Sequence, residues 1–239
     1  MFIPECLTPF SPFLCKQIQH VMALIFDMDG TMVDNMMTHH RGWQKTLAQY
    51  GLDLTLEEVM ATCHGKNLEI IEKLFPGKYS RAEQERISSE KESWYRSIFL
   101  PDLRLLPGLA ELLETAKAAG IPMGIGTAAP RANVDWALEN LGIRHYFQAV
   151  IQGDDVDLGK PHPEVFFKVA DRLGAPYGEC LVFEDSPTGA KTALNAGMKA
   201  IILTTTHRAD EFADIPSVLR CVSDFTGVDV GVELKKLRV

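Results

Sequence analysis

The feature that most constrains the fold of this chain is a series of short apolar runs. Three of them are followed by a turn and then by a helical pattern that ends in glycine. The runs span residues 22–27, 121–127, 149–152, 179–184 and 199–204, and the helical patterns end at Gly142, Gly174 and Gly197. Such runs, bounded by turn residues, are typical of buried strands in a parallel sheet. Proline at the start of a helix and glycine just after its end are the usual arrangement. The sequence therefore predicts an α/β fold in which helices cover a parallel sheet.

Residues 36–104 interrupt this alternation, because amphipathic helical patterns follow one another there without a strand between them. The patterns read WQKTLAQYG, LEEVMATCHG, NLEIIEKLF and RAEQERISSEKESWYRSIF. We expect an all-α cap domain at 36–104, inserted after the first strand into an α/β core made of residues 22–35 and 105–239. Residues 1–21 carry three prolines and lack a basic start, so we expect an N-terminal extension rather than a signal peptide.

The charge balance limits the partners of this protein. The 239 residues include 24 Lys and Arg against 32 Asp and Glu, a formal net charge of −8. This argues against nucleic-acid partners and against an anionic membrane surface, both of which favour basic proteins. No apolar run approaches the roughly 20 residues of a membrane span, and the five cysteines form no CxxC pair. We expect a cytoplasmic protein, and the sequence leaves open whether it is a monomer or a weak oligomer.

Polar residues stand where four predicted strands end. They are Asp27 and Asp29 after the first strand, Thr127 after the second, Lys160 after the third, and Glu184 and Asp185 at the fourth. In an open parallel sheet, ligands bind beyond the carboxyl ends of the strands. Two carboxylates as close as Asp27 and Asp29 repel each other unless a cation intervenes. We therefore expect Mg²⁺, a hard cation that prefers oxygen ligands, to be held by Asp27, Asp29, Glu184 and Asp185.

Two residues of this set suit a phosphate group. Thr127 can donate its hydroxyl to a phosphate oxygen, and the first N–H groups of the following helix add further donors. Lys160 supplies a compact positive charge that can neutralise the phosphoryl group or its nucleophile. An acidic protein needs such a local cationic site, or a metal, to hold an anionic substrate. The predicted partner is therefore a small phosphorylated metabolite.

At this point the chain resembles a known family. The segments FDMDGT (26–31), Thr127, GKPHPEVF (159–166) and FEDSPTGAKTALNAG (183–197) are similar, in order and spacing, to the four motifs of the haloacid dehalogenase superfamily. The helical insert resembles the cap of its β-phosphoglucomutase-like branch. The resemblance implies a Rossmann-like core and an aspartyl-phosphate mechanism, with Asp27 as nucleophile and Asp29 as general acid and then base. It also implies that Asp27, the Asp29 carbonyl, Asp185 and Glu184 hold the metal, while Thr127 and Lys160 stabilise the phosphoryl group.

The cap sequence bears on the substrate. HHRGW (39–43) and Lys91 are similar to cap residues of the β-phosphoglucomutases, but Gly65-Lys66-Asn67-Leu68 stands where those mutases carry a Gly-x-Ser-Arg loop, and Ala129-Pro130-Arg131 replaces their Ser-Lys-Asn. Both changes remove groups with which a mutase binds the phosphates of its sugar bisphosphate intermediate. We therefore predict a phosphatase of a small phosphorylated metabolite, with a β-phosphoglucomutase-type phosphosugar mutase as the alternative. The resemblance implies that the metabolite is a sugar phosphate, and other small phosphorylated metabolites stay open. The predicted substrate-binding residues are Thr127, Lys160, His39, Arg41, His64, Lys66, Lys91 and Arg131.

A different class of function matches one short segment. Residues 124–129 read Gly-Ile-Gly-Thr-Ala-Ala and fit the G-x-G-x-x-A pattern of a dinucleotide-binding turn. That interpretation would make the protein an NAD-binding oxidoreductase. Pro130 interrupts the turn, and no acidic residue ends the next predicted strand, so this alternative is the weaker one.

Overall fold

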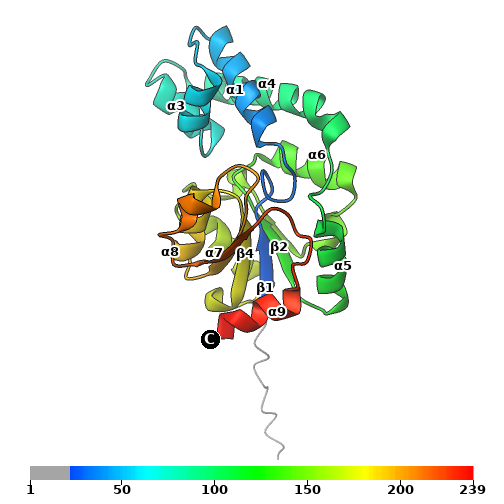
Figure 1. Cartoon of the computed structure of the whole chain (residues 1–239). Coiled ribbons are helices and arrows are strands. Elements are labelled where there is room, and N and C mark those ends of the chain that lie inside the picture. The colour runs from blue at the N-terminus through cyan, green and yellow to red at the C-terminus, as the bar shows by residue number, and fades with distance from the viewer. Residues whose placement is uncertain (1–21, 239) are drawn as a thin grey trace, which may run out of the picture.

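Six parallel strands form a single sheet in the computed structural model, which describes residues 22–238 (Figure 1). Their bounds are β1 Ala23–Phe26, β2 Met123–Gly126, β3 Ala149–Ile151, β4 Cys180–Glu184, β5 Lys199–Leu203 and β6 Val218–Val222. The order across the sheet is β3-β2-β1-β4-β5-β6. Strand β1 therefore pairs with both β2 and β4, and these three strands end side by side. All five predicted strands are present.

The sixth strand, β6, was not predicted from the sequence, because it lies at the edge of the sheet. All of its residues are only partly buried, and they read Val-Leu-Arg-Cys-Val. Arg220 breaks the continuous apolar run that marks a strand buried on both faces. An edge strand has no need of such a run, so its sequence resembles that of a loop.

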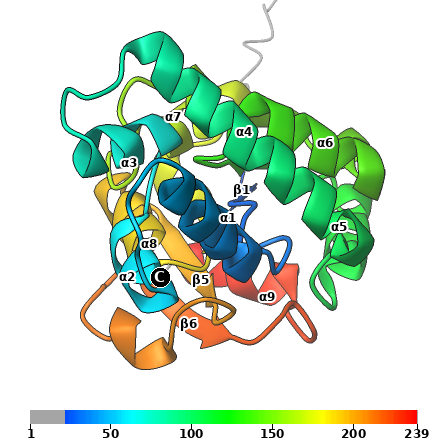
Figure 2. The ribbon, with the colours of Figure 1, turned by 90° about the horizontal axis from the view of Figure 1, so that it is seen from above.

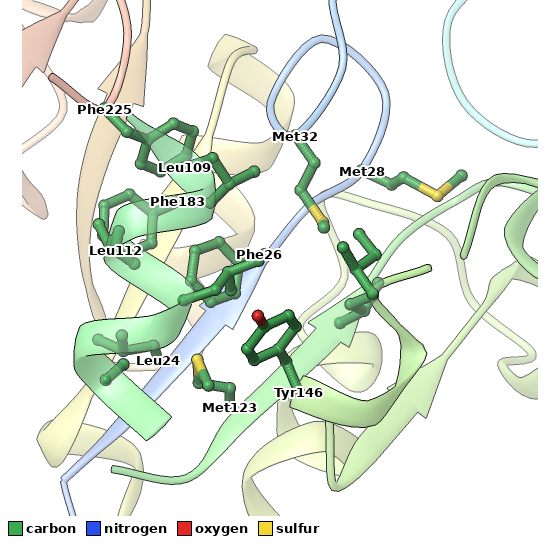
Figure 3. Close-up of a cluster of buried hydrophobic side chains, with 14 of the residues drawn as sticks. Leu24, Phe26, Met28, Met32, Leu109, Leu112, Met123, Tyr146, Phe183 and Phe225 are labelled. Carbon is green, nitrogen blue, oxygen red and sulfur yellow. The ribbon is translucent and has the colours of Figure 1, made fainter. Parts of the chain in front are cut away.

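Helices cover both faces of the sheet, as predicted. Helices α5 Leu109–Ala118, α6 Arg131–Leu141 and α9 Val230–Lys235 pack on one face, and α7 Glu164–Leu173 and α8 Pro187–Asn195 pack on the other. Alternate side chains of β1 serve the two faces: Leu24 and Phe26 join the first cluster, Ala23 and Ile25 the second. Figure 3 shows the first cluster, in which the rings of Phe26 and Phe183 stack with their centroids 4.9 Å apart.

Four helices between β1 and β2 form a separate group with its own hydrophobic core. They are α1 Met36–Gln49, α2 Leu56–Thr62, α3 Asn67–Leu74 and α4 Arg81–Phe99. Figure 1 shows the group apart from the sheet, on the side where the chain leaves β1, and Figure 2 shows α1 lying beside α4. Capping boxes at Thr55 and Ser80 begin α2 and α4. We call α1–α4 the cap helices; the division into a cap at 36–104 and a core at 22–35 and 105–239 stays a prediction.

Two other predictions concern the ends and surroundings of the chain. The N-terminal extension predicted for residues 1–21 lies outside the described residues. Within residues 22–238, none of the helices has both the length and the apolar character needed to cross a bilayer.

The glycines of the dinucleotide-like segment have a packing role. Gly124 and Gly126 lie within β2. A Cβ atom at Gly124 would lie 2.5 Å from Cγ1 of Val169, and one at Gly126 would lie 2.9 Å from the ring of Phe166. Both glycines therefore let α7 approach the sheet closely. This removes the main support for a dinucleotide-binding turn.

Candidate active site

Side chains from the ends of several strands line one cavity of about 240 Å³. From the core they are Asp27 after β1, Thr127 after β2, Lys160 after β3, and Glu184 and Asp185 at the end of β4. Residues of α1, α3 and α4 also line the cavity, which therefore lies between core and cap helices. The strand order explains the meeting, because β1 lies between β2 and β4.

Three of the four predicted metal ligands form a buried group. Asp27, Glu184 and Asp185 each offer a carboxylate oxygen within 4.8 Å of the other two. The ammonium group of Lys160 donates to Oδ1 of Asp27 over 2.7 Å and also to Glu184. When all are ionised, three carboxylates and one ammonium carry a net charge of −2. The group therefore carries more negative than positive charge.

The excess of negative charge shifts the pKa values of the buried groups. Burial raises the pKa of Asp27 to about 7, although the attraction of Lys160 opposes the shift. Burial, together with the charges of Glu184 and Asp27, raises the pKa of Asp185 well above its ordinary value. Burial lowers the pKa of Lys160, but its attraction to Asp27 and Glu184 is stronger, so that pKa is raised. A divalent cation would neutralise the excess charge and restore the ionised carboxylates.

Two glycines make room for these carboxylates. Gly30 has φ +76°, and a Cβ atom there would lie 2.1 Å from Oδ2 of Asp185. In α8, a Cβ atom at Gly189 would lie 1.8 Å from Cδ of Glu184. The backbone thus forms a close cradle around the two acids. An all-oxygen donor set in a confined space of this kind fits Mg²⁺.

The carboxylate of Asp29, the fourth predicted ligand, is held by different partners. Asn35 donates its side-chain amide to Oδ1 of Asp29 over 2.6 Å, and Nε2 of His39 lies 3.6 Å from the same oxygen. Burial raises the pKa of Asp29, but the nearby charge of His39 and the hydrogen bond from Asn35 outweigh it, so the pKa is lowered. The side chain of Asp29 is not part of the group formed by Asp27, Glu184 and Asp185.

A buried polar network connects Asp29 to the cap helices. Nδ1 of His39 lies 2.8 Å from Nζ of Lys91, which donates to Glu92 over 2.7 Å. Glu92 also accepts from Asn133 of α6 over 2.6 Å. The ring of His39 stacks on Tyr95 with centroids 3.8 Å apart. Two of the predicted substrate-binding residues, His39 and Lys91, are therefore fixed by neighbours at the wall of the cavity.

The remaining predicted substrate-binding residues divide into two groups. Thr127, Lys160 and His64 line the cavity, and Oγ1 of Thr127 accepts a hydrogen bond from the N–H of Ala129. Three others do not line it: Arg41 is exposed, Lys66 donates to the carbonyl of Val156, and Arg131 pairs with Asp155. The structure does not bring these three together with the cavity, and Lys66 instead ties α3 to the core.

Sequence reasoning missed three residues that position the site: Asn35, Glu92 and Asn133. Asn35 directly precedes α1, where asparagine is a common helix cap. It makes no capping hydrogen bond with its side chain, which faces Asp29 and Tyr95 instead. Its place in the predicted link between core and cap was the available signal. Glu92 lies in a run of charges that resembles an exposed helix face, yet it is only 4% exposed.

Comparisons with known proteins show what the chain is similar to. The sequence model of a family described as haloacid dehalogenase-like hydrolase matches residues 21–197. The fructose-1-phosphate phosphatase YqaB of Escherichia coli (strain K12) is 34% identical over 181 residues, which are 75% of this chain and 94% of that protein. A phosphorylated carbohydrates phosphatase of Thermotoga maritima is 30% identical over 183 residues, 75% of this chain and 83% of that protein.

A solved structure shares the fold. The β-phosphoglucomutase of Clostridium difficile superposes with a TM-score of 0.77 at 24% identity, and the match covers 91% of this chain and 97% of that one. At this level of identity the likeness concerns the fold alone.

Proposed function

This chain belongs to the haloacid dehalogenase-like hydrolases, and from that premise we propose that it is a Mg²⁺-dependent phosphatase of a small phosphorylated metabolite, a sugar phosphate. The observation that carries the proposal is the buried group of Asp27, Glu184 and Asp185 with its single ammonium partner, Lys160. The names of the two phosphatase relatives support the substrate class.

The first chemical step uses Asp27. Its carboxylate oxygen attacks phosphorus, the bond from phosphorus to the ester oxygen breaks, and an aspartyl phosphate forms. Lys160 and the hydroxyl of Thr127 compensate the charge of the phosphoryl oxygens, which matters because phosphoryl transfer depends mainly on positioning and charge. In the second step water attacks the same phosphorus, and phosphate and the free Asp27 carboxylate result.

Asp29 transfers the protons in both steps. It donates a proton to the leaving alkoxide in the first step and removes one from the attacking water in the second. Its lowered pKa keeps it ionised in the free protein, which is the form needed for the second step. A phosphate dianion that enters the cavity disfavours a second negative charge nearby, so it raises the pKa of Asp29 and favours the protonated acid.

The metal site is formed by Asp27, Glu184 and Asp185, with the backbone carbonyl of Asp29 as a further predicted ligand. When bound, Mg²⁺ supplies positive charge for the phosphoryl oxygens and offsets the net charge of −2. The protein holds these carboxylates by the close approach of Gly30 and Gly189.

The second candidate is a phosphosugar mutase, which the shared fold with a β-phosphoglucomutase favours. A mutase must hold the second phosphate of its intermediate. The two basic residues that could replace the missing arginine, Lys66 and Arg131, bind Val156 and Asp155. Water is therefore the preferred acceptor of the phosphoryl group.

The test measures free phosphate and isomerised ester from a panel of hexose monophosphates, with Mg²⁺ and with EDTA. We expect Mg²⁺-dependent phosphate release that Asp27→Asn lowers at least about a thousandfold. Asp53→Asn, at an exposed position of the cap, is the matched control. Rapid quenching should trap phosphorus on the wild-type protein. Activity of Asp27→Asn near the wild-type level would remove the nucleophile, and isomerised ester as the main product would favour the mutase.

A further inference from the structure

One buried side chain at the cavity has no role in the mechanism above. His40 of α1 is 3% exposed and lines the cavity. Neither of its ring nitrogens has a hydrogen-bond partner among the described residues. Burying a polar group without a partner costs free energy, so such a group at a ligand cavity indicates a partner that comes with the ligand.

The surroundings of His40 make it a neutral group. Burial, followed by the charges of His64, His39, Lys91 and His207, lowers its pKa to about 4. A neutral imidazole offers one donor and one acceptor. That combination matches a hydroxyl group, which is also both donor and acceptor, and does not match a phosphate dianion, which only accepts.

Fixed positive charge at the cavity is already paired. Among the described residues that line it, the lysines are Lys91 and Lys160, and no arginine is present. Lys91 pairs with Glu92, and Lys160 pairs with Asp27 and Glu184. Of the neighbouring histidines, His207 pairs with Glu211, and burial lowers the pKa of His64. A second phosphate group would find no unpaired lysine or arginine there.

Apolar side chains line the same cavity as His40. Met36, Trp43, Cys63 and Ile70 line the cavity together with His40. A polyhydroxylated carbon chain or ring presents both C–H faces and hydroxyl groups, so it complements a wall that is partly apolar and partly neutral and polar.

We propose that His40 is a specificity-determining residue that hydrogen-bonds a hydroxyl of the leaving alcohol, so that the site selects a hydroxylated monophosphate over an unsubstituted alkyl phosphate and over a bisphosphate. This inference rests on the proposed phosphatase function and names a residue of the same site that selects among phosphate esters. His40 acts on the choice of ester and takes no part in the transfer of the phosphoryl group.

The experiment compares two esters of equal carbon number, glucitol 6-phosphate and n-hexyl phosphate, by kcat/KM with Mg²⁺. The ratio of the two values reports recognition of hydroxyl groups. We expect the wild type to prefer glucitol 6-phosphate, His40→Leu to lower the ratio at least tenfold, and His40→Asn, which keeps a donor and an acceptor, to restore part of it. His145→Leu, which changes an exposed histidine away from the cavity, is the matched control. Fructose 1,6-bisphosphate should be a poorer substrate than fructose 1-phosphate.

The outcomes separate this inference from the function on which it rests. A wild type that hydrolyses neither ester would overturn both. Hydrolysis with a ratio that His40→Leu leaves unchanged would overturn the role of His40 alone, and a preference for the bisphosphate would overturn the selection against a second phosphate group. Unfolding curves for His40→Leu and His40→Asn show whether a lower kcat/KM ratio reflects a folding defect. A ratio that is lowered in a folded His40→Leu and partly restored in His40→Asn supports the inference. An equal lowering of the ratio in both variants contradicts it.

Discussion

The side-chain amide of Asn35 donates a hydrogen bond of 2.6 Å to the carboxylate of Asp29. The same nitrogen lies 2.7 Å from the hydroxyl of Tyr95 in α4, and Oδ1 of Asn35 accepts from the N–H of Gly30. Asn35 therefore connects the proposed general acid to α4 of the cap helices and to the turn after β1. It is a positioning residue, since its contacts orient Asp29.

We expect Asn35→Ala to lower kcat about tenfold or more, with a smaller effect on KM, because Asp29 loses the hydrogen bond that orients it. It should also raise the pKa of Asp29, because a hydrogen bond to the charged form is lost. Steady-state kinetics against pH with a hexose monophosphate test both effects. Asn140→Ala, at an exposed position of α6, is the control. Equal and large effects of the two variants would contradict the positioning role.

Asp29→Asn should act according to the leaving group. An alkoxide needs a proton to leave, whereas p-nitrophenolate does not, so the variant should slow hydrolysis of a hexose monophosphate by about 10²–10⁴ and that of p-nitrophenyl phosphate much less. The measurement is kcat/KM for both esters in wild type and variant. An equal loss for both esters would speak against Asp29 as leaving-group acid.

Gly189→Ala should impair the site although alanine is the better helix former. The added Cβ atom would lie 1.8 Å from Cδ of Glu184, so the carboxylate must leave its position beside Lys160. We expect a loss of about 1–3 kcal/mol in the free energy of unfolding, together with weaker Mg²⁺ activation. Gly178→Ala is the matched control, because no atom lies within 4 Å of a Cβ there. Urea unfolding and Mg²⁺ titration of activity measure the two effects. Equal stability of Gly189→Ala and Gly178→Ala would contradict the predicted clash with Glu184.

Glu92 should stabilise the fold in a pH-dependent way. Burial raises its pKa, but attraction to Lys91 and His39 and hydrogen bonds from Asn67 and Lys91 lower it from 4.5 to about 2. Its contribution is therefore fully present above about pH 4.5 and lost as the pH falls towards 2. We expect Glu92→Gln to lower the free energy of unfolding by roughly 3 kcal/mol at pH 7, and the difference from wild type to shrink below pH 4.5.

Urea unfolding at a series of pH values measures this difference. Glu90→Gln, which changes an exposed glutamate of the same helix, is the control and should have little effect at any pH. A difference between wild type and Glu92→Gln that is constant from pH 7 to pH 3 would show that the charge of Glu92 does not stabilise the fold.

Mg²⁺ should stabilise the folded protein even without substrate. The ion binds the folded carboxylates and not the unfolded chain, so 100 times its Kd adds about 2.7 kcal/mol to the free energy of unfolding. For a chain of this length we expect Tm to rise by several degrees. Thermal unfolding with Mg²⁺ and with EDTA tests this, and Asp185→Asn should abolish most of the rise. A Tm that is indifferent to Mg²⁺ would contradict the metal site.

Much of the fold could be predicted from local patterns. Residues such as Ala23–Phe26 and 180–183 are apolar and buried on both faces of the sheet, and that burial can be read from the sequence as a continuous apolar run. The edge strand at Val218–Val222 could not be read in this way, because an exposed edge tolerates Arg220. The cap helices were readable from their amphipathic periods.

Within the candidate site, the sequence by itself determined which chemical groups stand at the strand ends: Asp27, Thr127, Lys160, Glu184 and Asp185. Only the tertiary structure decided how they divide. It places Asp27 with Glu184 and Asp185, turns the Asp29 side chain to Asn35 and His39, and leaves Arg41 exposed. The physical reason is that spacing along a chain specifies the face on which a side chain starts, whereas hydrogen bonds and charges contributed by distant elements specify where its polar end lies.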